Sequence, residues 1–207
     1  MLRIDHVVYA VADLDEAAVR FRGTFGLDSV AGGRHERWGT ANRIVPLGDE
    51  YVELVAAIDR DAAAASGFGR AVIERADAGG GWVTFALATD DLDAIASRLG
   101  LEVTSGSRTK PDGTILRWRG AGLDDPRRQP SMPFFLAWDV PAELHPGRAR
   151  AGHGVRAQGI AWVEVGGDAG RLHWWLGGEK LPIRVTDGEL GIRRIAVATS
   201  DAEIEID

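Results

Sequence analysis

Apolar and polar residues alternate along the first strand-like run of the chain, and apolar residues then recur at helical spacing. Val7, Tyr9 and Val11 occupy every second position, as strand residues do when one face of a sheet is buried. The helical pattern that follows comprises Leu14, Ala17, Ala18, Phe21 and Phe25. Asp13 is a good N-cap residue, and Gly26 suits the left-handed position that ends a helix. The pattern predicts a strand followed by a helix.

This pattern occurs a second time, 78 residues later, with Asp91 in the place of Asp13. Residues 82–93 align with residues 4–15, and the two Asp-Leu-Asp triplets coincide. Three short strand-like runs follow each helix. They are residues 27–30, 42–47 and 51–56 in the first copy, and 101–104, 114–118 and 133–139 in the second. Each copy therefore predicts a β-α-β-β-β module.

A weaker third copy of the pattern occupies the C-terminal part of the chain. It predicts a strand over residues 160–165, a helix from Asp168 to Leu176, and further strands over 181–185, 192–198 and 204–206. The chain is thus divided into a first module (1–58), a connector (59–81), a second module (82–140), a polar connector or lid (141–158) and a C-terminal third module (159–207). The predicted fold class is α+β.

Composition narrows the classes of function. The 207 residues carry a formal net charge of −7, which disfavours binding to nucleic acids and to anionic membranes. There is no cysteine, so thiolate nucleophiles, Cys-ligated zinc and disulfides are excluded. Charged residues interrupt residues 1–16, and no apolar signal segment is found there. We expect a cytoplasmic protein with a small-molecule ligand, and a homodimer is the assembly considered.

Two polar residues stand on otherwise apolar strands. His6 shares the face of Ile4, Val8 and Ala10, and Glu53 lies between Val52 and Leu54. A carboxylate inside an apolar strand is costly unless it is paired or bound to a cation. The parity of the adjacent strand directs Asn42 to the same side. We predict that His6, Asn42 and Glu53 converge on one concave surface; an ion pair between Glu53 and Arg43 is the alternative.

A histidine on the first strand and a glutamate on the fourth strand of a duplicated β-α-β-β-β module resemble the vicinal-oxygen-chelate superfamily. Further segments resemble its glyoxalase-like domain branch: Gly33-Arg34-His35, Gly39-Thr40-Ala41-Asn42-Arg43, Tyr51-Val52-Glu53-Leu54, Trp82-Val83-Thr84, Pro133-Phe134-Phe135, Trp138-Asp139, His145-Pro146-Gly147 and His153-Gly154. The superfamily includes glyoxalases, extradiol dioxygenases and antibiotic-resistance binding proteins. The resemblance implies that the paired modules curl into a cup-shaped sheet, with a divalent metal held inside on ligands from the first and fourth strands.

The sequence departs from this ligand pattern in the second module. The counterpart of His6 is Thr84, and the counterpart of Glu53 falls near Leu136 or Ala137. The resemblance therefore implies an incomplete metal site on His6 and Glu53, which a further histidine could extend. A divalent ion (iron, manganese, zinc or nickel) and no cofactor at all both stay open.

Other residues are candidates for contacts with the ligand. Trp82 and Trp138 share the parity of the cup face, and we expect them to form its walls. His145, Arg148 and His153 lie in the polar connector, which is either a tether or a lid that presents cations to an anionic ligand. His35 is interpreted as a solvated loop residue, and His173 as a surface or interface residue.

Two functions follow from these candidates. In the first, the cup binds a small oxygen-bearing organic molecule, and His6 and Glu53 carry metal-dependent chemistry of a lyase, isomerase or dioxygenase type. In the second, the cup binds or sequesters the molecule without metal and without catalysis, as resistance-type relatives do. A regulatory or scaffolding domain that uses the cup only for association is a weaker third hypothesis.

Overall fold

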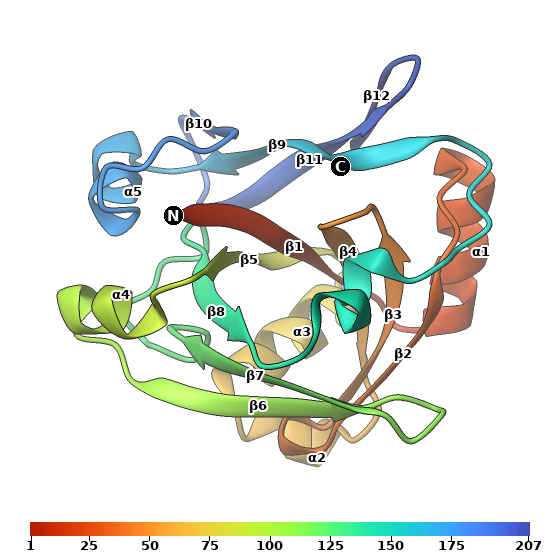
Figure 1. Cartoon of the computed structure of the whole chain (residues 1–207), viewed down its shortest axis with the longest axis horizontal. Coiled ribbons are helices and arrows are strands. Elements are labelled where there is room, and N and C mark those ends of the chain that lie inside the picture. The colour runs from red at the N-terminus through yellow and green to blue at the C-terminus, as the bar shows by residue number, and fades with distance from the viewer.

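A computed structural model describes residues 1–207, in which an eight-stranded barrel is backed by a separate four-stranded sheet (Figure 1). The first half of the barrel contains β1 (Leu2–Ala10), α1 (Leu14–Phe25), β2 (Val30–His35), η1 (Glu36–Trp38), β3 (Thr40–Pro46) and β4 (Tyr51–Ala57). The second half contains β5 (Gly81–Thr89), α4 (Leu92–Leu99), β6 (Val103–Thr109), β7 (Ile115–Ala121) and β8 (Phe134–Trp138). Each half has the predicted order β-α-β-β-β, so the α+β class and the duplicated modules are confirmed.

The two modules close on each other. Around the barrel the strand order is β1-β4-β3-β2-β6-β7-β8-β5. The first strand of each module pairs in parallel with the last strand of the same module, β1 with β4 and β5 with β8. β1 and β5 pair antiparallel along their length, whereas β2 and β6 meet only at Arg34 and Thr109. The barrel therefore has one long seam and one short seam between its modules.

The helices begin and end where the sequence predicts. Asp13 caps α1 by accepting hydrogen bonds from the backbone N–H groups of Asp15 and Glu16, and Gly26 ends it at φ 67°. Asp91 and Gly100 have the same roles in α4. Figure 1 shows α1 and α4 at opposite sides of the barrel, each on the outer surface of its own module.

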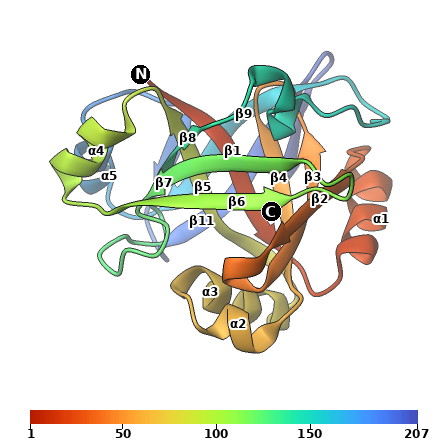
Figure 2. The ribbon, with the colours of Figure 1, turned by 60° about the horizontal axis from the view of Figure 1, so that its bottom comes forward.

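The connector between the modules closes one end of the barrel. It forms α2 (Arg60–Ala64) and α3 (Gly67–Asp77), which lie below the strands in Figure 2. Phe68 and Val72 of α3 join Val8 and Val55 of the barrel strands in a small apolar cluster. α3 therefore fills one end of the barrel interior, and the polar residues of the strands line the rest of it.

The C-terminal unit forms its own sheet. After η2 (Ala142–Leu144) and η3 (Pro146–Arg148), it contains β9 (Ala157–Gly166), α5 (Ala169–Trp175), β10 (Ile183–Thr186), β11 (Gly191–Thr199) and β12 (Glu203–Ile206). The element order matches the prediction, but the strand order is β10-β9-β11-β12, and β9 pairs in parallel with the strand directly after the helix. This unit therefore differs from the two barrel modules in topology, and it packs outside the barrel.

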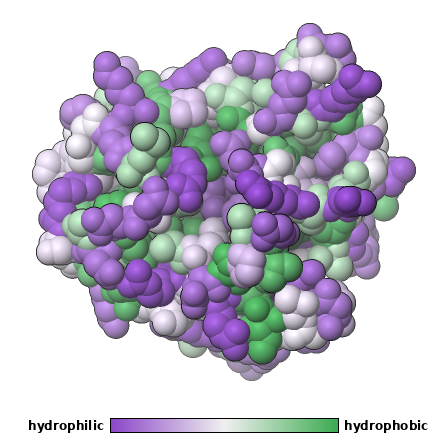
Figure 3. Space-filling model, viewed as in Figure 1, coloured by the Kyte–Doolittle hydropathy of each residue, from purple (hydrophilic) through white to green (hydrophobic).

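The main hydrophobic core lies between the barrel and this second sheet. It includes Phe85 and Leu87 of β5 together with Val163 of β9 and Ile195 of β11. Hydrophilic residues cover most of the face seen in Figure 3, with apolar residues exposed between them. None of the helices is both long and apolar enough to cross a lipid bilayer.

Candidate functional site

A cavity inside the barrel brings His6, Asn42 and Glu53 together, as strand parity predicts. It contains about 500 Å³ of space not occupied by atoms, including its mouth. The lining residues are His6, Val8, His35, Trp38, Asn42, Tyr51, Glu53, Phe68, Arg108, Trp118, Leu123, Phe134, Leu136 and Trp138. The polar members come mainly from the first module, and the second module contributes mostly aromatic and apolar side chains.

Glu53 lies at the centre of the polar residues. Its Oε1 atom accepts a hydrogen bond from the side-chain amide of Asn42. The Nε2 atom of His6 is 3.6 Å from Oε2, and the Nε2 atom of His35 is 3.9 Å from Oε1. Arg43 instead binds Ser29 and Asp15, so the structure does not contain the alternative Glu53–Arg43 ion pair. The buried carboxylate thus has three polar neighbours and faces the cavity.

His6 is oriented by the residue that precedes it. Its Nδ1 atom is 2.6 Å from Oδ1 of Asp5, and its ring stacks on Tyr51 with centroids 4.5 Å apart. Burial by itself raises the pKa of Asp5, but hydrogen bonds from His145 and His6 outweigh it and hold this pKa well below its usual range. The ionised Asp5 can only accept, so Nδ1 of His6 carries a proton and the Nε2 atom faces Glu53.

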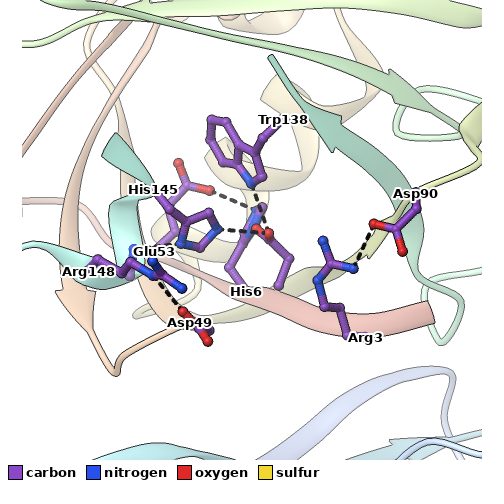
Figure 4. A network of polar contacts seen from close by, with 10 residues as sticks. Arg3, His6, Asp49, Glu53, Asp90, Trp138, His145 and Arg148 are labelled. Carbon is purple, nitrogen blue, oxygen red and sulfur yellow. Dashed lines mark hydrogen bonds and ion pairs between the residues drawn. The ribbon is translucent and has the colours of Figure 1, made fainter. Parts of the chain in front are cut away.

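Asp5 binds three side chains in all. Its Oδ2 atom accepts hydrogen bonds from the indole N–H of Trp138 at 2.9 Å and from Nε2 of His145 at 3.1 Å (Figure 4). The backbone N–H of Gly147 donates to Nδ1 of His145, which is consistent with a proton on Nε2. The sequence pattern does not reveal Asp5, because strand parity assigns it to the face opposite to that of His6.

His35 is a cavity residue, which corrects its interpretation as a solvated loop residue. Strand β2 runs through the Gly32-Gly33 pair and ends at His35, whose exposed fraction is only 6%. Burial lowers the pKa of His35 to about 4; Glu53 opposes this shift, and Arg108 and His6 contribute to it. His35 is therefore neutral at pH 7, and its Nδ1 atom is 3.1 Å from the hydroxyl of Thr40.

Arg108 enters the cavity from the second module. It lies on β6 and is 4% exposed. Its Nη1 atom donates to Oδ1 of Asn42 at 3.2 Å, so Asn42 links the guanidinium to Glu53. Sequence reasoning missed Arg108 because the run Ser105 to Thr109 has no apolar alternation that would mark a buried face.

Aromatic side chains form the walls of the cavity. The indoles of Trp38 and Trp118 stack with centroids 6.4 Å apart, and Trp138 is 5.5 Å from Trp118. Trp138 lines the cavity as expected, but Trp82 does not. A register shift between Val8 and Tyr9 in the β1–β5 pair places Trp82 opposite Tyr9 on the outer face, where its indole N–H donates to the carbonyl of Ile206. The bulge that reverses its side is not visible in the sequence pattern.

The three candidate residues of the polar connector separate in the structure. His145 reaches Asp5 and touches the rings of Tyr51 and Trp138, outside the cavity lining. Arg148 is paired with Asp49 at 2.7 Å near the surface (Figure 4). His153 lies between Pro46, whose carbonyl is 2.7 Å from its Nε2 atom, and the backbone N–H of Asp28. Arg148 and His153 thus do not line the cavity, and the connector contacts the barrel through these bonds.

The residues present do not form the ligand set of a metal centre. His6 and His35 approach different oxygens of Glu53, and no group of three or more His, Asp or Glu side chains is placed to hold a metal ion. In the second module, the hydroxyl of Thr84 accepts a hydrogen bond from Arg128, and Leu136 is apolar. The positively charged Arg108 lines the same cavity. These neighbours suit an organic molecule better than a cation.

A family model described as a glyoxalase-like domain matches residues 4–181. This chain belongs to the glyoxalase-like domain family. The resemblance to that branch of the vicinal-oxygen-chelate superfamily is thereby confirmed. No curated protein matches the chain.

A solved structure shares the fold along most of its length, and other solved structures match part of the chain. A hypothetical protein from Staphylococcus aureus is 17% identical, with a TM-score of 0.73 over 93% of this chain and 88% of that one. Methylmalonyl-CoA epimerase from Mycobacterium tuberculosis is 23% identical, with a TM-score of 0.47 over 67% of this chain and 89% of that one. The Streptomyces coelicolor methylmalonyl-CoA epimerase is also 23% identical, with a TM-score of 0.46 over 66% and 95%.

Proposed function

We propose that this glyoxalase-like protein binds a small oxygen-bearing organic molecule in the barrel and transfers a proton to or from it, as an isomerase or lyase does. The observation that supports this proposal is the pair formed by His6 and Glu53 inside an aromatic cavity. Nε2 of His6 and Oε2 of Glu53 are 3.6 Å apart, and both can accept a proton.

The surroundings of the pair suit acid–base chemistry. Asp5 fixes the orientation and the Nδ1 proton of His6, as the carboxylate of a His–Asp pair does in other enzymes. Asn42 holds the other oxygen of Glu53, so the carboxylate keeps its position while Oε2 faces His6. Glu53 would remove an α-hydrogen as a proton from a carbonyl compound placed beside Oε2, which leaves the enolate of that compound. Nε2 of His6 would take this proton over from Glu53, and the reverse transfers would return a proton to the α-carbon.

The test is deuterium exchange in D₂O, followed by proton NMR, on a set of small aryl ketones and 2-oxo acids with α-hydrogens. We expect the wild-type protein to exchange at least one of them faster than buffer does. Glu53→Gln keeps the shape but removes the base, and should lower this rate by roughly 10²–10⁴-fold. Glu36→Gln, at an exposed side chain, is the matched control and should leave the rate unchanged.

The second candidate function is binding without chemistry. The observation that favours it is the apolar lining, in which Trp38, Trp118 and Trp138 can stack on a ligand. In this case the protein binds some of the same ketones and 2-oxo acids, but it does not speed up the exchange of their α-hydrogens for deuterium. Alternatively, exchange occurs and the Glu53→Gln variant catalyses it as fast as the wild-type protein does. Either result would contradict the proton-transfer proposal.

A further inference from the structure

Arg108 is the one buried cation in the cavity, and a glycine on the neighbouring strand allows the close backbone contact beside it. It lies next to Thr109, whose carbonyl approaches Gly33 across the short seam between the modules. A Cβ atom at Gly33 would lie 2.5 Å from that carbonyl oxygen and 3.5 Å from the Cδ atom of Arg108. Only a glycine allows β2 and β6 to come this close, and the arginine side chain enters the barrel beside this contact.

The guanidinium of Arg108 has no counter-ion in the protein. Its one hydrogen bond runs from Nη1 to Oδ1 of Asn42, and no carboxylate lies within 4.0 Å of its nitrogens. Its Nε atom is buried without a hydrogen-bond partner. An arginine stays charged in proteins, and a buried charge without a partner is costly. Glu53 does not neutralise it directly, because Asn42 stands between them.

The unpaired edge of this guanidinium matches a carboxylate. Nη1 is occupied by Asn42, whereas Nε lacks a partner and Nη2 makes no hydrogen bond. These two nitrogens form the edge of the guanidinium that binds the two oxygens of a carboxylate through parallel hydrogen bonds. Nε has almost no exposed surface, so a carboxylate oxygen reaches it only when the side chain or a lining residue shifts as the ligand binds. The backbone N–H of Gly33 donates to the same Oδ1 atom as Arg108, so Asn42 is held on both sides and keeps the guanidinium in place.

We infer that the cavity takes a small organic anion whose carboxylate binds Arg108 and whose flat, apolar body packs against the indoles that line the wall. This inference rests on the cavity of the proposed function and names its class of ligand. Trp118 stands between Trp38 and Trp138, and Phe134 and Leu136 extend the apolar wall. A conjugated or aromatic carboxylate satisfies both the unpaired guanidinium and the aromatic walls, whereas a neutral molecule satisfies only the walls.

The test measures binding of matched pairs by isothermal calorimetry, with the full-length protein. The probes are benzoate and 2-naphthoate, each compared with its neutral amide. We expect at least one carboxylate to bind about tenfold or more tightly than its amide, and Arg108→Gln to remove this preference while the amide affinity stays the same. Arg119→Gln is the control, because Arg119 is exposed and paired with Asp93, and it should keep the preference.

Arg108→Lys covers the case in which Arg108→Gln does not fold. It keeps the charge and removes the bidentate edge, so the preference for the carboxylate should fall without disappearing. The inference is overturned if neither carboxylate binds better than its amide, or if the arginine variants bind the carboxylate as the wild type does.

Glu53→Gln separates this inference from the proposed function. The substitution removes the base and one negative charge from the cavity, so it should keep or strengthen carboxylate binding while deuterium exchange is lost. If exchange is never detected and the Arg108-dependent preference is found, only the proton-transfer proposal fails. If Glu53-dependent exchange occurs but amides bind as well as carboxylates, only the assignment of the ligand class fails.

Discussion

Asp5 accepts hydrogen bonds from His6, Trp138 and His145, and this one carboxylate fixes the orientation of a cavity residue, a wall residue and a connector residue. Asn42 has a similar position on the other side of the cavity, where its amide joins Glu53 to Arg108. Each polar group of the site is thus oriented by a neighbour that is itself buried, which favours a site formed before the ligand binds.

His35 gives the site a measurable pH signature. Burial lowers its pKa in the folded protein to about 4, whereas a histidine in the unfolded chain titrates near 6.5. Above pH 6.5 it is neutral in both states and contributes no pH dependence. Between pH 6.5 and 4 only the unfolded chain takes up the proton. The free energy of unfolding therefore decreases as the pH is lowered through this range, by about 3 kcal/mol in total.

Urea unfolding at pH 7 and pH 4.5 measures this effect. From pH 7 to pH 4.5, the free energy of unfolding of the wild-type protein should decrease by about 2–3 kcal/mol more than that of His35→Gln, because the two proteins share all other titrating groups. An equal loss in both proteins would show that His35 titrates normally, and would contradict its burial.

At the scale of elements, the sequence predicted the framework better than the site. Alternation and capping residues located β1, β4, β5 and both module helices. The hydrophobic pattern failed at β2, which begins at Val30, three residues later than predicted, and runs through glycines that carry no hydrophobic signal. It failed also at Trp82, where a bulge reverses the parity. In both places the contacts that decide the structure come from another strand, so local pattern could not reveal them.

The glycines of β2 lead to a prediction with a matched control. A Cβ atom at Gly32 would lie 2.0 Å from Oδ1 of Asn42 and 2.8 Å from its backbone carbonyl. Gly32→Ala should therefore lower the free energy of unfolding by about 1–3 kcal/mol, because Asn42 must move. Gly23→Ala, in α1 with no atom within 4 Å of the new Cβ, should raise it by roughly 0.5–1 kcal/mol. Urea unfolding of both variants checks the opposite signs; a neutral Gly32→Ala would contradict the tight packing on Asn42.

At the scale of the whole molecule, the second sheet supports the strands that carry the site. β1 and β5 present His6 and Thr84 on one side, and Phe85 and Trp82 pack towards the C-terminal unit on the other. The indole N–H of Trp175 also donates to the carbonyl of Pro133, just before β8. The sequence predicted this unit but not its position, because a weak repeat does not show which face of the barrel it will cover.

Because one hydrophobic core joins the barrel to the second sheet, we predict that the chain unfolds in one cooperative transition. Ile195 of β11 is fully buried in this core, so Ile195→Ala should lower the free energy of unfolding by about 2–5 kcal/mol. For a chain of 207 residues this corresponds to a fall in the melting temperature of roughly 5–15 °C.

Differential scanning calorimetry should show a single peak that moves as a whole, with equal calorimetric and van't Hoff enthalpies. Ile58→Ala, at a side chain that is 46% exposed, is the control and should change the stability by less than about 0.5 kcal/mol. Two peaks, of which only one moves, would mean that the second sheet folds independently of the barrel and does not hold β1 and β5 in place.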